Sequence, residues 1–312
     1  MNGEELRRSY SICTSPLENE LRVAVKKTIM GRFSTWANEQ LKKGDTIEVL
    51  PPTGKFYTPL APTQKKHYLA FAAGSGITPV ISIIKTTLAT EPQSTFTLVY
   101  GNRNRGSIIF KEQLEALKNQ YTSRLAIHHI LSREQTDTPV NYGRIDTEKC
   151  QQLNNKLIFA DQADEIFICG PEEMIFSVKD WLEDLGIDRK KVHFELFTTP
   201  GQKNEIAQKQ SINTGSSEKT SNVSIKLDGV TFDLAIPFNG ATILDAALEA
   251  GADLPFACKG GVCSTCKAKL LKGKVEMDAN YALEDDEVAE GFILTCQSHP
   301  RSEKIEVDFD VK

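Results

Sequence analysis

The chain has 312 residues, of which 40% are hydrophobic and 25% charged, with 20 Gly and 13 Pro. This length suits two or three domains, and the composition excludes collagen-like, coiled-coil and wholly disordered proteins. The best apolar stretch, residues 67–84, is interrupted by Gly, Ser, Thr and Pro, so no segment reaches the ~18 apolar residues of a membrane-spanning helix. The first residues, MNGEELRRSYS, contain no apolar signal-peptide core, and we expect a cytoplasmic protein.

Charge and cysteine are distributed unevenly along the chain. Residues 222–312 hold 9 Lys and Arg against 16 Asp and Glu, whereas residues 1–221 hold 28 and 26. Nucleic-acid binding needs a basic surface, so an acidic C-terminal module on a near-neutral body argues against a nucleic-acid partner. The seven cysteines are odd in number and four of them fall within residues 258–296, which argues against a disulfide framework.

The pattern of elements predicts three domains and one linker. Residues 198–221, TTPGQKNEIAQKQSINTGSSEKTS, are polar and poor in apolar side chains, which is typical of a flexible linker. We expect a first domain over 1–65, a second over 66–197 and a third over 222–312. Within the first domain, β-rich runs and turn residues predict strands at 10–13, 21–27 and 45–50 and a short helix near 34–42.

Residues 66–197 alternate apolar strands with amphipathic helices. Such alternation predicts βαβ units and a parallel sheet covered on both faces. The expected strands span 67–73, 95–101, 125–132, 164–170 and 192–197, and the expected helices span 78–89, 110–121, 147–157 and 171–186.

Four cysteines have the spacing of an iron–sulfur site. Cys258, Cys263 and Cys266 form C-x4-C-x2-C, and 29 residues separate them from Cys296, which matches plant-type [2Fe–2S] ferredoxins. A structural zinc site is the alternative, but such sites usually use two close pairs or Cys/His mixtures. FACKGGVCSTCKAKLLKG and GFILTCQSHP resemble plant-type ferredoxins, and the resemblance covers residues 222–312.

A second set of residues lies at a predicted strand-to-helix turn. Gly74, Gly76 and Thr78 in AFAAGSGITP can let the backbone approach a pyrophosphate at a helix N-terminus, and we expect Pro79 at the first helical position. A tight turn that needs positive φ explains the glycines equally well. The third glycine and the ribose-binding acidic residue of ordinary dehydrogenases are missing.

Two further motifs follow the third and fourth predicted strands at the same edge of the sheet. Cys169-Gly170-Pro171 closes the fourth strand, and Ser132-Arg133 closes the third. Ser and Arg can bind a 2′-phosphate, Arg through two parallel charge-assisted hydrogen bonds. A solvated charge at a strand end is the alternative for Arg133.

Together, GSGITP, SREQ and CGP resemble the pyridine-nucleotide domain of the ferredoxin–NADP reductase superfamily. RSYS near the N-terminus matches the flavin motif of that superfamily. The resemblance implies that Arg8 binds the FAD pyrophosphate, that the Tyr10 ring lies against the flavin and that Ser11 hydrogen-bonds near its reactive nitrogen. GRFS resembles the second phosphate element, with Ser34 as a helix N-cap and donor. In isolation, RSYS and GRFS could be ordinary strand and cap residues, but their order and their distance from GSGITP favour the flavin motif.

The resemblance implies a shortened flavin domain. In the superfamily the RxYS strand is normally the fourth of about six barrel strands, whereas only a few residues precede Arg8 here. We therefore expect missing first strands and unpaired strand edges. The expected fold class is multidomain, with a partial, N-terminally truncated antiparallel β-barrel, a parallel α/β nucleotide-binding domain and an α+β β-grasp ferredoxin domain.

This domain order implies a single-chain electron-transfer reductase. NADPH would reduce FAD, FAD would reduce the [2Fe–2S] cluster, and the cluster would reduce an oxygenase of di-iron or Rieske type, with no side chain as nucleophile. RSYSICTSP, LSREQ and FELF most resemble the reductases of phenylacetyl-CoA epoxidases. Reductases of ketosteroid hydroxylases and fatty-acid desaturases share the domain order, and a ferredoxin-only carrier is the alternative if the shortened domain binds no FAD.

The other chemistry-bearing residues have structural explanations. His128 and His129 are neighbours on a strand, so their side chains point to opposite faces and cannot chelate one metal. We expect Cys13 and Cys150 to be packing or surface residues rather than catalytic ones. The acidic run 284–287 is either a solvated face or a docking site for a basic partner.

Overall fold

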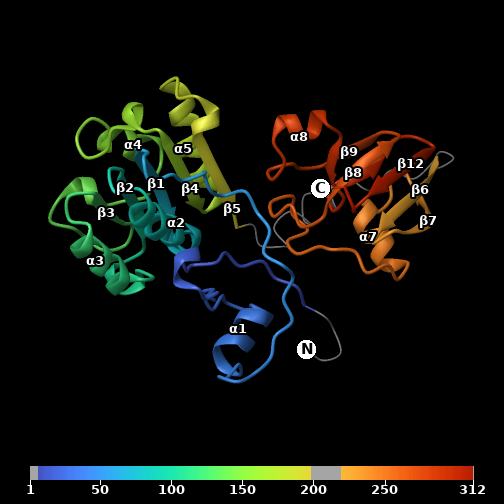
Figure 1. The fold of residues 1–312 in the computed structure, drawn as a ribbon, viewed down its shortest axis with the longest axis horizontal. Helices are drawn as coiled ribbons and strands as arrows, with labels where there is room; N and C mark the ends of the chain where they lie inside the picture. The colour runs from blue at the N-terminus through green and yellow to red at the C-terminus, as the bar shows by residue number, and fades with distance from the viewer. Residues whose placement is uncertain (1–5, 198–218, 312) are drawn as a thin grey trace. The chain divides into compact units, whose positions relative to one another are not determined.

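The computed structural model describes residues 6–197 and 219–311, which fall into two compact units (Figure 1). No helix among these residues is long and apolar enough to cross a membrane. Residues 10–48 and 55–197 make one unit, while residues 219–311 make the other, together with residues 6–9 and 49–54.

The first unit is built on a five-stranded, entirely parallel sheet, as the strand–helix alternation predicts. The strand order is β3-β2-β1-β4-β5, so the chain starts at the centre, winds to one edge and then returns to the other side of β1. The strands are β1 (His67–Ala73), β2 (Thr95–Asn102), β3 (Leu125–Leu131), β4 (Glu165–Gly170) and β5 (Val192–Leu196). The helices are α2 (Ile77–Thr90), α3 (Lys111–Gln120), α4 (Thr147–Leu153) and α5 (Glu172–Asp184).

Helices cover both faces of this sheet because both faces are apolar. Tyr68, Ala70 and Ala72 of β1 belong to a buried cluster with the apolar residues of α2 and with Leu114 of α3. On the opposite face, the Phe71 ring meets Trp181 of α5 edge-on, with ring centroids 6.2 Å apart. Side chains alternate between the faces of a strand, so a near-continuous apolar run in β1 is what a doubly covered strand requires.

The N-terminal part of this unit differs from the expected strands. No strand forms within residues 6–66; an isolated bridge joins Ile12 to Val23, beside a 2.8 Å bond from the Cys13 N–H to the Arg22 carbonyl. The predicted strands at 10–13, 21–27 and 45–50 are therefore wrong as strands, and the predicted partial barrel is not clearly seen. A β-rich run becomes a strand only when a neighbouring strand accepts its backbone hydrogen bonds, which sequence periodicity does not supply.

Two helix starts also differ from the expectation. The predicted helix near 34–42 is α1 (Arg32–Glu39), and its N-cap is Gly31 rather than Ser34. Pro79 is the third residue of α2, not the first. Both positions still lie in the first turn, where backbone N–H groups have no helical acceptor and proline is tolerated.

In its described residues the second unit is a mixed β-sheet with two short helices, as expected for a ferredoxin domain. The sheet has the order β10-β8-β12-β6-β7, in which β12 runs parallel to β6 and the other pairs are antiparallel. The five strands are β6 (Thr220–Leu227), β7 (Val230–Pro237), β8 (Lys267–Lys272), β10 (Phe292–Leu294) and β12 (Lys304–Asp308). A two-stranded sheet of β9 (Val275–Met277) and β11 (Ser298–Pro300), with the helices α7 (Ile243–Glu249) and α8 (Asp285–Ala289), completes the unit.

The predicted linker lies mostly outside the described residues, which omit 198–218. Its last two residues are not linker, because Thr220 and Ser221 already belong to β6. Ser221 is fully buried, as a polar residue can be when a strand ladder satisfies its backbone.

Candidate functional site

The glycine-rich turn after β1 fits tightly against the end of β4. A Cβ atom on Gly76 would lie 2.0 Å from the carbonyl oxygen of Cys169, and one on Gly170 would lie 3.2 Å from the Ala73 nitrogen. Gly74 has φ +54°, in the left-handed region, and the Thr78 hydroxyl donates to the Ser75 carbonyl at 3.0 Å. The two turns can approach this closely only because these positions have no side chain. At the carboxyl edge of the sheet, where open α/β folds bind ligands, the turns after β1 and β4 are therefore in direct backbone contact.

The ends of β2 and β3 lie beside each other at the same edge. The N–H groups of Ser132 and Arg133 donate to the carbonyls of Asn102 and Arg103, at 2.9 and 2.8 Å. The backbone therefore brings the side-chain positions of Arg103 and Arg133 together, and both residues are exposed. Neighbouring guanidinium groups at a strand end can bind a phosphate.

A neighbouring arginine is neutralised within the structure. Arg105 donates its backbone N–H to the Glu134 carboxylate at 2.8 Å, and its Nε lies 3.4 Å from the same carboxylate. Glu134, the acidic residue of the SREQ motif, therefore binds Arg105 and holds the loop after β2 in place. Sequence reasoning missed both Arg103 and Arg105, although their closeness to the end of an apolar strand is a signal that could have found them.

A hydrogen bond joins the flavin motif to the last strand of the parallel sheet. The Ser11 hydroxyl donates to the Glu195 carboxylate at 2.8 Å. Glu195 of β5 is the ladder partner of Cys169 in β4, so the three side chains gather at neighbouring positions. Cys169 is fully buried, and burial together with the Glu195 charge raises the pKa of its thiol well above the usual value. A neutral thiol therefore lies at the ladder position beside a carboxylate, and that carboxylate accepts from the Ser11 hydroxyl.

The sequence did not identify Glu195, although a carboxylate in the apolar strand VHFELF is a recognisable signal. Lys26 was missed as well. Its Nζ lies 3.8 Å from the position that a Cβ on Gly74 would occupy, beside the turn predicted to hold the pyrophosphate. An ammonium group at that place adds positive charge to an anion-binding turn.

The other flavin-motif residues are positioned as follows. Tyr10 is half-buried and its ring lies 5.6 Å from that of Phe33, centroid to centroid. Ser34 is buried and its hydroxyl is paired with the Thr28 hydroxyl at 2.9 Å. Arg8 is exposed, and its guanidinium donates to the Arg7 carbonyl. The Tyr10 and Phe33 rings are tilted by 36° to one another.

The four motif cysteines stand as two pairs in the second unit. Cys258 is hydrogen-bonded to Cys263, and Cys266 is hydrogen-bonded to Cys296. Cys258, Cys266 and Cys296 are buried, and Cys263 is partly exposed. Within residues 6–197 and 219–311, no three His, Cys, Asp or Glu side chains form a group that could hold one metal ion. Two thiolates for each of two irons is the donor set of a [2Fe–2S] cluster, and these pairs fit it.

Backbone N–H groups point at the sulfurs from a loop with unusual dihedral angles. The Gly260 N–H donates to Cys258 Sγ at 3.3 Å. Lys259, Gly261 and Ser264 all have positive φ, between 49° and 74°, so the loop curls around its cysteines instead of extending. Amide donors around thiolates are the usual surroundings of an iron–sulfur cluster.

Within each cysteine pair, the contact shifts the two thiol pKa values in opposite directions. The hydrogen bond from Cys258 lowers the pKa of Cys263, while the same bond and burial raise the pKa of Cys258. Cys266 and Cys296 behave alike, with the pKa of Cys266 raised and that of Cys296 lowered by the bond between them. Iron binds cysteine as the thiolate, so each pair would supply two thiolates to one iron.

Comparison with known proteins agrees with both halves of this description. Residues 71–180 match the oxidoreductase NAD-binding domain family, and residues 225–301 match the 2Fe-2S iron-sulfur cluster binding domain family. A reductase of known structure, phthalate dioxygenase reductase, described as modular for electron transfer from pyridine nucleotides to [2Fe–2S], is 26% identical with a TM-score of 0.55. This likeness covers 99% of the present chain and 84% of that one.

Relatives that match nearly the whole chain identify its family. A component of the 1,2-phenylacetyl-CoA epoxidase of Escherichia coli K12 is 49% identical over all 312 residues, which span 86% of that protein. The chain belongs to the iron–sulfur flavoprotein reductases of multicomponent oxygenases. The ferredoxin reductase component of 3-ketosteroid-9-alpha-monooxygenase from Mycobacterium tuberculosis (strain CDC 1551 / Oshkosh) is 36% identical over 97% of this chain and 80% of its own length. This member of the family is thus an NAD(P)H-dependent reductase that delivers electrons to a [2Fe–2S] cluster.

Proposed function

We propose that this chain is the reductase component of a phenylacetyl-CoA epoxidase, passing electrons from NADPH through FAD to the [2Fe–2S] cluster and on to a di-iron oxygenase. The 49% identity to the E. coli epoxidase component over the whole chain supports the choice of partner. NADPH and reduced thiols both point to the cytoplasm.

The single observation that carries the redox reaction is the bond between Ser11 and Glu195. When bound, a flavin accepts two electrons as hydride and releases them one at a time, which suits a one-electron cluster. The chain's own contribution is to fix the Ser11 hydroxyl by its donation to Glu195, which leaves the hydroxyl oxygen as an acceptor toward a ring N–H, and to keep a neutral Cys169 at the strand end. A polar group fixed in this way needs no reorganisation when the charge of the ring changes.

We assign the remaining roles residue by residue. Arg8 and Ser34 would hold the FAD phosphates and Tyr10 the flavin face; Gly74, Gly76 and Thr78 would receive the NADPH pyrophosphate. Ser132 and Arg133 would bind its 2′-phosphate, and the turn Cys169-Gly170-Pro171 would border the nicotinamide. Cys258, Cys263, Cys266 and Cys296 would ligate the two irons. The functional domains would be 1–65, 66–197 and 222–312, joined by a linker.

Reconstitution with separately purified oxygenase components tests the choice of partner. We expect NADPH-dependent epoxidation of phenylacetyl-CoA with a phenylacetyl-CoA epoxidase and little turnover with a Rieske-type ketosteroid hydroxylase. The reverse result would favour the ketosteroid hydroxylase system, for which the 36% identity to the mycobacterial reductase is the supporting observation.

An absorption spectrum of the purified chain separates the reductase from a plain electron carrier. Flavin bands together with sulfur-to-iron charge-transfer bands support the reductase. Cluster bands alone, after incubation with excess FAD, would instead support a ferredoxin that acts as a one-electron carrier.

A further inference from the structure

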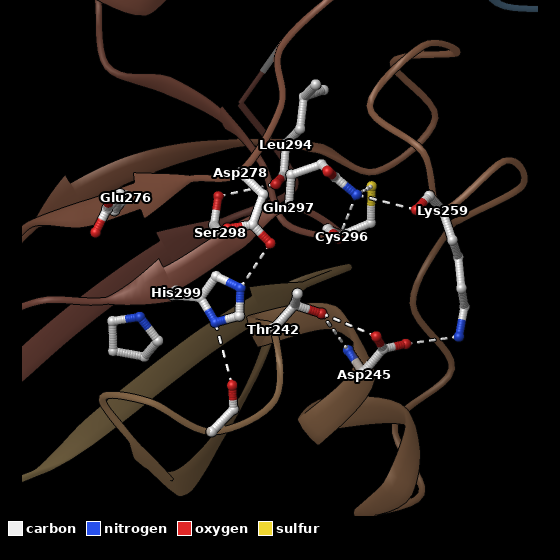
Figure 2. A network of polar contacts seen from close by, with 12 residues as sticks. Thr242, Asp245, Lys259, Glu276, Asp278, Leu294, Cys296, Gln297, Ser298 and His299 are labelled. Carbon is white, nitrogen blue, oxygen red and sulfur yellow. Dashed lines mark hydrogen bonds and ion pairs between the residues drawn. The ribbon is translucent and has the colours of Figure 1, made fainter. Parts of the chain in front are cut away.

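The turn that follows Cys296 carries a buried side-chain amide beside the cysteine pairs. Gln297 is 9% exposed. Its Nε2 lies 2.9 Å from the Cys296 carbonyl oxygen, 3.0 Å from the Lys259 carbonyl oxygen and 3.7 Å from Cys296 Sγ (Figure 2). The amide therefore lies between the fourth cysteine and the loop that carries the first three.

These three acceptors fix the orientation of the amide. The Nε2 group has two hydrogens to donate, and every neighbour named above accepts. An amide oxygen in the same place would face two carbonyl oxygens and a sulfur, which is repulsive. The end of Gln297 that faces Cys296 Sγ is consequently the N–H end.

The backbone holds Gln297 rigidly in this position. Its N–H donates to the Leu294 carbonyl at 2.9 Å, and its carbonyl accepts from the Asp278 N–H at 2.9 Å. The side chain lies over Gly261, where an added Cβ would come within 3.2 Å of Gln297 Cγ. A donor fixed before the electron arrives needs no reorganisation when charge develops.

The loop residue that Gln297 contacts is held at its other end too. Lys259 has φ +51° and its Nζ forms a 2.7 Å ion pair with Asp245, whose backbone N–H is capped by Thr242 at the start of α7 (Figure 2). Gln297 donates to the carbonyl of Lys259, and Asp245 of α7 pairs with the ammonium group of the same residue. The backbone strain of Lys259 is thereby supported from two sides.

We propose that Gln297 is a positioning residue of the iron–sulfur centre, which raises the reduction potential of the cluster and retains it by tying Cys296 to the Lys259 loop. The inference rests on the ligation by four cysteines proposed above. Reduction adds one negative charge, which the sulfurs share, so the positive N–H end of the amide, 3.7 Å from Cys296 Sγ, stabilises the reduced form more than the oxidised form.

Redox titration of the full-length holoprotein, followed by cluster absorbance and by electron paramagnetic resonance, tests the proposal. Gln297→Met keeps the approximate volume and removes the donor, and we expect a reduction equilibrium constant lower by about tenfold, which is roughly 59 mV for one electron. Gln297→Glu keeps the shape and replaces the donor by a carboxylate, so we expect a larger decrease. Cluster bleaching by a chelator should be faster in both variants.

Ser298→Ala is the matched control. Ser298 is the next residue, is buried, and donates its hydroxyl to the Leu294 carbonyl at 2.8 Å, so its loss disturbs the same turn without touching a sulfur. We expect the wild-type potential in this variant. Equal shifts in Gln297→Met and Ser298→Ala, or no shift in Gln297→Met and Gln297→Glu, overturn the proposal.

The cluster content of the variants completes the test. If Gln297→Met and Gln297→Glu retain no iron while Ser298→Ala retains two irons, the tying role is supported; if all three lose iron alike, it is overturned. If the wild-type chain, reconstituted with iron and sulfide, binds no cluster, then the proposed ligation itself fails, and the inference with it.

Discussion

The Ser11 hydroxyl donates to the Glu195 carboxylate at 2.8 Å, a contact between residues 184 positions apart in the chain. It joins the flavin motif to the final strand of the nucleotide-binding sheet. Glu195 is the ladder partner of Cys169, so the same contact also connects the motif to the end of β4.

We expect Ser11→Ala and Glu195→Gln each to slow the reduction of bound flavin by NADPH by about tenfold, the effect of ~1.4 kcal/mol on a barrier. Because both substitutions break one hydrogen bond, the double variant should be no slower than the slower single variant. Stopped-flow bleaching of the flavin band measures the rate. Ser9→Ala, within the same motif but exposed, is the control and should match the wild type.

The position of Arg133 leads to a prediction about cofactor preference. A charge-assisted hydrogen bond contributes about 1.5–3 kcal/mol, so Arg133→Ala should raise the KM for NADPH by roughly 10- to 100-fold. NADH has no 2′-phosphate and should be affected little. Arg189→Ala, which removes an arginine paired with Glu183 before β5, serves as control. Equal losses for NADPH and NADH would remove the 2′-phosphate role.

The cysteine pairs predict which thiols matter for iron. Cys266→Ser should abolish the cluster absorption and lower the iron content, since its partner Cys296 then lacks the second thiolate. Reduction of flavin by NADPH should persist while cytochrome c reduction falls. Cys150→Ser removes a buried thiol from the other unit and should keep both irons. Unchanged cytochrome c reduction in Cys266→Ser, with direct flavin leakage subtracted, would contradict relay through the cluster.

The close approach at Gly76 makes it a stability determinant. Gly76→Ala places a Cβ 2.0 Å from the Cys169 carbonyl oxygen, so one of two buried turns must move. Overpacking of this kind costs about 1–3 kcal/mol, and the displaced turn should also weaken NADPH binding. Gly106→Ala, whose Cβ would meet its nearest neighbour at 3.6 Å, should leave stability nearly unchanged. Tryptophan fluorescence during urea unfolding reports on this unit, because both Trp36 and Trp181 lie in it.

Two half-buried histidines predict acid sensitivity of the same unit. Burial lowers the pKa of His128 and of His129, the latter despite the nearby Glu115. Above pH ~6.5 both are neutral in folded and unfolded chains; as the pH falls from 6.5 through the lowered native pKa, the unfolded chain takes up more protons and stability is lost. The urea midpoint should therefore fall between pH 7 and 5.5. His129→Phe should flatten this dependence, whereas Ile127→Val should lower the midpoint equally at both pH values.

Sequence reasoning predicted the parts of the molecule that depend on local pattern. The parallel sheet follows from five apolar runs, and the set of four motif cysteines follows from their spacing. Their arrangement as two pairs comes from the structure. Glu195 was missed because its role comes from a tertiary contact with Ser11, to which no spacing points. The strands expected at 10–13 and 45–50 failed because a strand needs a partner as well as a propensity, and Ser34 lost the N-cap position because the helix begins earlier.

The strand order of the second unit has a consequence for biosynthesis. β12 lies between β8 and β6, at the centre of a sheet whose other strands all precede it in the chain. A ribosome therefore releases the cysteine loop and its surrounding strands before the strand that completes their sheet. Until β12 emerges the thiols lack a closed domain around them, so stable insertion of iron and sulfide has to wait for translation of this strand, although every ligand has been made by then.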